Sequence, residues 1–119
     1  MIYRFGITTA ITYSETNKLK TILPLARGVI HQIEILFPPG PAGLLHIHLN
    51  RGIHQIWPSN SEGNFSADDN TIGFREHFEI TGRPYQLEAY TWNDDDTYPH
   101  LVIVRIGVLE RKFILRRLF

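Results

Sequence analysis

The stretch GVIHQIEILFPPGPAGLLHIHLNRGIHQIW, residues 28–57, decides the fold of this chain. Apolar residues alternate with polar ones on both sides of a corner rich in proline and glycine, residues 38–43. A period of two is typical of a strand that is buried on one face. Because proline cannot donate to a strand ladder, the corner must separate two strands. The stretch therefore predicts a strand, a corner, a second strand and, after a turn at Asn50 and Gly52, a third.

The same alternation assigns a face to the paired histidines of this stretch. The apolar side chains of the second strand are Leu45, Ile47 and Leu49. We therefore expect His46 and His48 on the opposite, outward face. This position favours a contact surface over a reaction centre.

For His31, in the first strand, the alternation predicts the reverse. It shares its face with apolar residues and is expected in the core, hydrogen-bonded to a partner. The other members of that face are Val29, Ile33, Ile35 and Phe37.

The rest of the chain repeats the strand pattern between turn signals, and no segment has a convincing helical period. Two long polar loops, residues 59–70 and 93–99, interrupt it, and Phe65 is expected to anchor the first loop. The pattern predicts an all-β protein, an antiparallel β-sandwich of about eight strands, and the corner and long loops favour a jelly roll. The expected strands are residues 3–13, 19–23, 29–37, 45–49, 53–57, 71–80, 85–92 and 101–109.

Length and composition exclude several classes. A chain of 119 residues is expected to form one domain. It has no cysteine, which removes a disulfide framework, a thiolate zinc site and a cysteine nucleophile. No run approaches the ~20 apolar residues of a spanning helix, and the first residues lack the pattern of a signal peptide. We expect no membrane partner.

Charge is balanced overall but unevenly distributed. The 12 basic residues equal the 12 acidic residues in number. Between residues 62 and 96 there are nine acidic residues and two basic ones, whereas residues 105–119 hold five basic residues and one acidic. Such a chain is poorly suited to general nucleic-acid binding, and it suits packing between copies with opposed patches.

The C-terminal segment ERKFILRRLF, residues 110–119, follows a predicted single β-sandwich domain of residues 1–109. Its period fits either a strand or a helix. Since five of its ten residues are large and apolar, we expect it to pack on its own domain or on a neighbouring copy. The predicted interface residues are Arg111, Lys112, Phe113, Ile114, Leu115, Arg116, Arg117, Leu118 and Phe119.

A metal site is suggested by the spacing of Gly40, His46 and His48, which resembles the opening of the first cupin motif. In cupins the two histidines bind a metal together with a glutamate and a third histidine. Here His54 and His100 could take the place of that third histidine only by an accident of the fold. Two imidazoles two residues apart on a strand can chelate one ion. However, no glutamate follows His48 by four or five residues, and the second cupin motif is absent. We expect no metal and no cofactor.

The aromatic residues near the loops suggest a second alternative, a carbohydrate- or small-ligand-binding module. Aromatic rings can stack on sugars while carboxylates bind hydroxyl groups. No serine elbow is present, so catalysis is not expected. The candidate platform residues are Trp57, Tyr90, Trp92, Asp94, Asp95, Asp96 and Tyr98.

The plan of the whole chain resembles that of short single-jelly-roll structural proteins of virus particles, especially those that decorate tailed-phage heads. The resemblance rests on one β domain, the FPPGPAG corner (37–43), the QIWPSN loop entry (55–60) and the NDDDTYPH loop (93–100). It implies a non-catalytic subunit that forms a homo-oligomer, such as a trimer, and binds a larger protein shell. The expected location is a virion or a cytoplasmic assembly.

Overall fold

The computed structural model describes residues 1–110, and the interface predicted at 111–119 lies outside the described residues. The described part contains eight strands and no helix, which confirms the all-β prediction. It accordingly holds no helix that could cross a membrane. The strands are β1 (Ile2–Thr9), β2 (Leu19–Pro24), β3 (Gly28–Phe37), β4 (Leu45–Arg51), β5 (His54–Trp57), β6 (Asn70–Ile80), β7 (Gln86–Asn93) and β8 (His100–Glu110).

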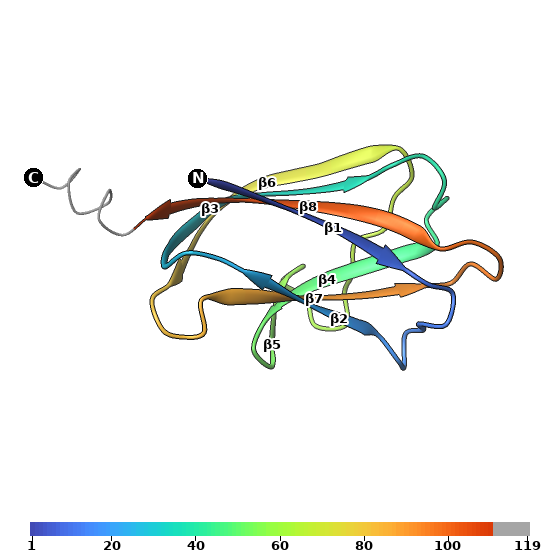
Figure 1. Cartoon of the computed structure of the whole chain (residues 1–119), viewed down its shortest axis with the longest axis horizontal. Coiled ribbons are helices and arrows are strands. Elements are labelled where there is room, and N and C mark those ends of the chain that lie inside the picture. Colours follow the sequence, from blue (N-terminus) through green and yellow to red (C-terminus); the bar gives the residue numbers. More distant parts are fainter. Residues whose placement is uncertain (111–119) are drawn as a thin grey trace, which may run out of the picture.

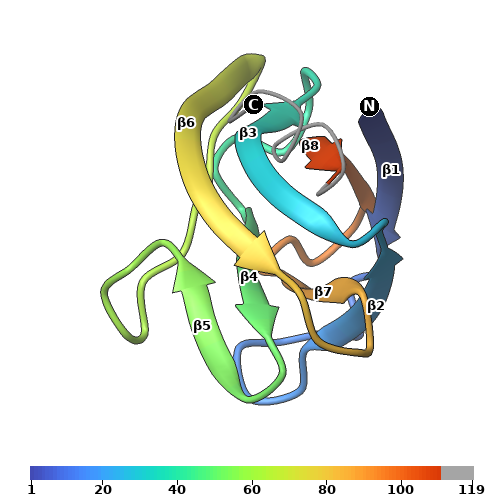
Figure 2. The same ribbon diagram turned by 90° about the vertical axis from the view of Figure 1, so that its left-hand side faces the viewer.

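The strands form two antiparallel sheets of four strands each, packed face to face (Figures 1 and 2). One sheet has the order β1-β8-β3-β6 and the other the order β2-β7-β4-β5. Most connections cross from one sheet to the other, and only β4 and β5 are joined as a hairpin within one sheet. This strand order is that of a jelly roll, in which two Greek keys wrap around one core. The predicted fold class is therefore confirmed.

The core lies between the sheets and is made of alternate residues from each strand. In β4, the side chains of Leu45, Ile47 and Leu49 are fully buried in it, as the alternation predicted. Each such side chain contributes about 1.5–3 kcal/mol through its burial. Phe65 packs against this core from the loop between β5 and β6, which confirms the predicted anchor. Its backbone pairs with Ile47, with N–O distances of 2.8 and 3.0 Å.

The prediction for His31 was wrong because β3 contains a bulge. The register of β3 against β8 shifts between Ile30 and Gln32. Ile30 therefore faces the core and is fully buried, whereas His31 is only half-buried. Strict alternation cannot detect one extra residue in a strand, and the extra residue reverses the face of every residue before it.

The connections of the sandwich lie at two opposite ends (Figure 1). We call one of them the loop end. It holds residues 10–18, 38–44 and 94–99, which join β1 to β2, β3 to β4 and β7 to β8. The β5–β6 connection, residues 58–69, starts beside β4 and reaches this end with Asp68, which accepts hydrogen bonds from Gly40 and Ala42. The opposite end holds the shorter connections 25–27, 52–53 and 81–85, together with Met1 and the last residue of β8.

Candidate functional site

Two histidines and two aromatic rings form stacked pairs on the outer face of the β2-β7-β4-β5 sheet. The register places His46 opposite Trp92 and His48 opposite Tyr90. The ring centroids of the first pair are 4.9 Å apart with planes inclined by 11°, and those of the second are 5.1 Å apart at 13°. The outward position predicted for both histidines is confirmed. We call this set the histidine face.

Trp92 is enclosed on this face although it points away from the core. His46 stacks on it from the β4 side, and Lys18, just before β2, places its Nζ 4.8 Å from the centroid of the indole ring. Only 3% of Trp92 is exposed. Its ring is therefore closed to a sugar that would need an open aromatic face.

His48 is held in one neutral form by its two neighbours. Its Nδ1 lies 2.7 Å from the Oδ1 of Asn50, and its Nε2 lies 3.2 Å from the Nζ of Lys18. Because the amide oxygen can only accept, Nδ1 donates and Nε2 accepts from the ammonium. Burial lowers the pKa of His48; the Asn50 hydrogen bond opposes this shift, and the Lys18 charge adds to it.

His46 is also engaged at both ring nitrogens. Its Nδ1 lies 2.7 Å from the Oδ1 of Asn64 and its Nε2 lies 2.8 Å from the Oδ2 of Asp94. A metal at either histidine would have to displace these partners. His54 is exposed on the short strand β5. Within residues 1–110, no group of three or more histidine, aspartate or glutamate side chains could hold a metal ion.

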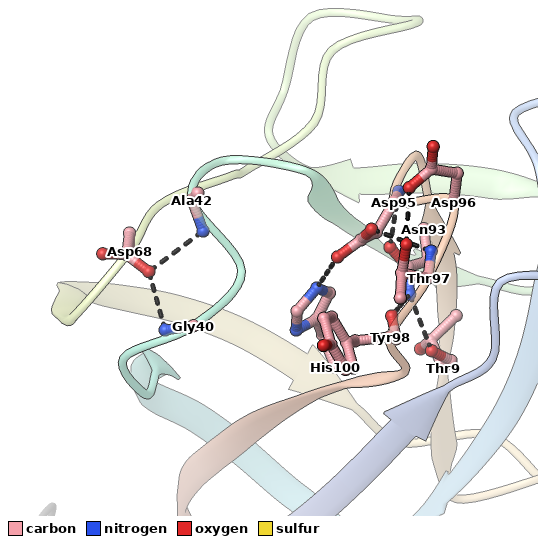
Figure 3. Close-up of polar contacts among 10 residues, drawn as sticks. All are labelled: Thr9, Gly40, Ala42, Asp68, Asn93, Asp95, Asp96, Thr97, Tyr98 and His100. Carbon is pink, nitrogen blue, oxygen red and sulfur yellow. Dashed lines mark hydrogen bonds and ion pairs between the residues drawn. The ribbon is translucent and has the colours of Figure 1, made fainter.

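Hydrogen bonds from the β7–β8 connection join the loops of the loop end into one unit (Figure 3). The Nδ2 of the buried Asn93 donates to the backbone oxygens of Thr9 and Tyr98, at 3.1 and 2.9 Å. The next amide, of Asp94, donates to the backbone oxygen of Leu44 at 2.9 Å. The β1–β2, β3–β4 and β7–β8 connections are thereby held together.

Two carboxylates complete this network. The Oδ2 of Asp95 lies 2.7 Å from the Nε2 of His100, and this contact, with the Thr97 amide, lowers the pKa of Asp95. The Oδ1 of Asp68 accepts from the amides of Gly40 and Ala42, both at 2.9 Å, and these two bonds lower the pKa of Asp68. Figure 3 shows both groups. Asp68 thus ties the β5–β6 connection to the Pro/Gly-rich corner.

The structure separates the residues that the sequence grouped as a ligand platform. Trp57 packs in the core, is 4% exposed and donates through its Nε1 to the Oε1 of Glu76 at 3.0 Å. Tyr90 and Trp92 belong to the histidine face. Tyr98 alone among the aromatic candidates is largely open, with 65% of its surface exposed. The remaining candidates, Asp94, Asp95 and Asp96, lie in the β7–β8 connection of the loop end.

Sequence reasoning missed Lys18, Asn50 and Asn64, which complete the histidine face. Asn50 lies two residues after His48 on the same strand, so alternation alone predicts that the two side chains share a face. Lys18 and Asn64 reach the site only through the pairing of distant segments, which a single sequence does not reveal.

Eight large apolar side chains are exposed in the part of the chain that the structure describes. Met1, Ile2 and Ile53 lie at the opposite end, and Ile22 lies in β2. The other four lie in or beside the connections of the loop end: Ile11, Leu44, Tyr98 and Leu101, exposed by 43%, 37%, 65% and 38%. We call these four residues the loop-end patch. The connections that meet at this end carry six acidic residues and one lysine there: Glu15, Asp68, Asp69, Asp94, Asp95, Asp96 and Lys18.

Comparison of the chain with protein-family models, characterised proteins and solved structures finds no match. The functional argument therefore rests on the site itself, since a jelly roll alone does not specify a function.

Proposed function

We propose that this protein is a non-catalytic structural subunit that acts through protein–protein contacts in a multimeric assembly. The role that we assign is that of a jelly-roll subunit that decorates, or associates with, a larger protein shell such as a virus capsid. The observation that carries the proposal is the loop-end patch. Four large apolar side chains exposed at one end of a small domain, surrounded by charge, are typical of a surface that a partner covers.

The hydrogen bonding of the loop end supports this role. Asn93, Asp95 and Asp68 hold the connections in place through contacts that are buried at Asn93, half-buried at Asp95 and exposed at Asp68. A surface that is already ordered loses less conformational entropy when a partner binds. Long loops fixed in this way suit a permanent contact.

The histidine face favours contacts over ligand binding. His46 and His48 use all four of their ring nitrogens within the fold, and Trp92 is enclosed between His46 and Lys18. A ligand would have to break these contacts before it gained its own. We therefore assign the histidine face a structural role.

Light scattering coupled to size-exclusion chromatography tests the proposal on the full chain. We expect a homo-oligomer whose mass is a small multiple of 13.8 kDa. A monomer at every concentration would contradict the assembly role. The genetic setting gives a second test: capsid and portal genes beside this one would support shell decoration, and a setting among enzymes of sugar metabolism would count against it.

A further inference from the structure

We propose that the loop-end patch of one copy receives residues 111–119 of a neighbouring copy. This inference rests on the proposed role as an assembly subunit and names the contact by which copies associate. The occupant is a segment of this same chain, and the surface is the loop end.

The two partners match in both charge and apolar character. The segment RKFILRRLF holds four basic residues and five large apolar ones. The loop-end patch exposes four large apolar side chains, and the connections that meet at the loop end hold six acidic residues and one lysine there. Opposite charges around an apolar contact steer association and exclude partners of the wrong sign. A purely acidic peptide, or a purely apolar one, would match this surface less well.

The geometry of β8 requires that the contact be made between copies. Leu101 lies at the loop end of β8, and Glu110, from which the segment continues, lies at the other end. The nine steps from Leu101 to Glu110 span about 31 Å. The nine residues 111–119 reach at most about 32 Å when fully extended. A segment that turned back would therefore bring only its last residue as far as Leu101, so its five apolar residues could not together lie on the loop-end patch of their own copy.

The distribution of charge between the two ends also favours a contact with a neighbouring copy. The connections 25–27, 52–53 and 81–85 carry two arginines, Arg27 and Arg83, and Glu110, the last residue of β8, adds one acidic group at this end. The basic segment thus starts where acidic groups are few, and the loop end of a neighbour offers it a larger excess of opposite charge.

A contact between two different ends of the same molecule is heterologous. Each copy supplies one segment and one patch, so copies join head to tail, and the assembly closes into a ring when the rotation between neighbours permits it. A trimer is one such ring. This arrangement would leave the outer faces of both sheets free for contacts with a shell.

A pair of complementary full-length variants tests the contact. The loop variant Asp96→Lys with Tyr98→Lys changes exposed side chains of the loop end. The segment variant Arg116→Glu with Leu118→Glu changes the proposed occupant. We expect each variant alone to be monomeric by light scattering. In an equimolar mixture the intact segment of the first can bind the intact loop end of the second, and we expect a heterodimer.

Matched controls carry the same kinds of change at other exposed sites. Glu79→Lys with Ile53→Lys and Arg75→Glu with Ile22→Glu should leave the oligomer intact. Circular dichroism checks that each variant is folded, and the milder pair Asp96→Asn with Tyr98→Ser replaces the loop variant if that one fails to fold.

The outcomes separate this inference from the proposed function. A wild-type oligomer that persists in either variant would overturn the contact and leave the assembly role standing. Monomeric variants that fail to pair in the mixture would also overturn it, because the two regions would then serve separate interfaces. A monomeric wild-type chain would overturn both the contact and the assembly role.

Discussion

Replacement of Trp92 by alanine should strongly destabilise the fold, and it distinguishes a structural histidine face from a ligand platform. The indole is 3% exposed and lies between the imidazole of His46 and the ammonium of Lys18. Loss of a buried tryptophan side chain costs about 3–5 kcal/mol. The aromatic contact and the cation–π contact, worth about 0.5–1.5 and about 0.5–2 kcal/mol, are included in that loss rather than added to it.

The free energy of unfolding of a domain this size is about 5–15 kcal/mol, so the variant should lose a large part of its stability. Urea denaturation followed by tryptophan fluorescence and circular dichroism measures the loss. Trp92→Phe keeps an aromatic ring and should lose less than half as much. Lys18→Met keeps the aliphatic stem and removes the ammonium, with its cation–π contact and its hydrogen bond to His48, so we expect a loss of about 1–2 kcal/mol.

A loss below about 1 kcal/mol for Trp92→Ala would refute this reasoning, because a side chain that packs so little is free to serve a ligand. A glycan array gives the complementary measurement. We expect no binding by the wild-type protein, and a hit that Trp92→Ala abolishes without loss of stability would restore the platform interpretation.

Three further predictions concern the backbone and the titrating groups. A methyl group at Gly28 would lie 2.1 Å from the backbone oxygen of Leu109, so Gly28→Ala should cost about 1–3 kcal/mol in urea denaturation; Gly82→Ala, which meets nothing within 4 Å, should be close to neutral. Because the pKa of His48 is lowered in the folded protein, stability should be full above pH ~6.5 and fall as the pH drops below that value. His48→Gln should flatten this fall between pH 7 and 5, and an unchanged slope would contradict the assignment. The pKa of Asp95 is also lowered, so its contribution should be lost only as the pH falls below ~4, and Asp95→Asn should flatten that part of the acid unfolding curve.

The fold could be predicted from the sequence because alternation is a local signal. The inward positions of Leu45, Ile47 and Leu49 follow from a period of two, and they fix the outward face of His46 and His48. The same rule failed at His31, where a bulge adds one residue that leaves no trace in the apolar pattern.

The candidate site could be predicted only in part, because its contacts join distant segments. Trp57 and Trp92 looked alike in the sequence, as aromatic residues beside polar loops. Trp57 ends β5 and turns into the core, whereas Trp92 lies opposite His46 on the outer face. The loop-end patch depends on which connections share one end of the sandwich, and only the strand order supplies that information.

The pairing of Phe65 with Ile47 has a consequence for solubility. Strand β5 covers only the last part of β4, from Leu49 to Arg51, and Phe65 takes up the backbone groups of Ile47 that β5 leaves open. An unpaired strand edge is a template to which strands of other molecules can add, and this addition leads to aggregation. Because its own loop covers this edge, many copies of the protein can lie close together without adding strands to one another along β4.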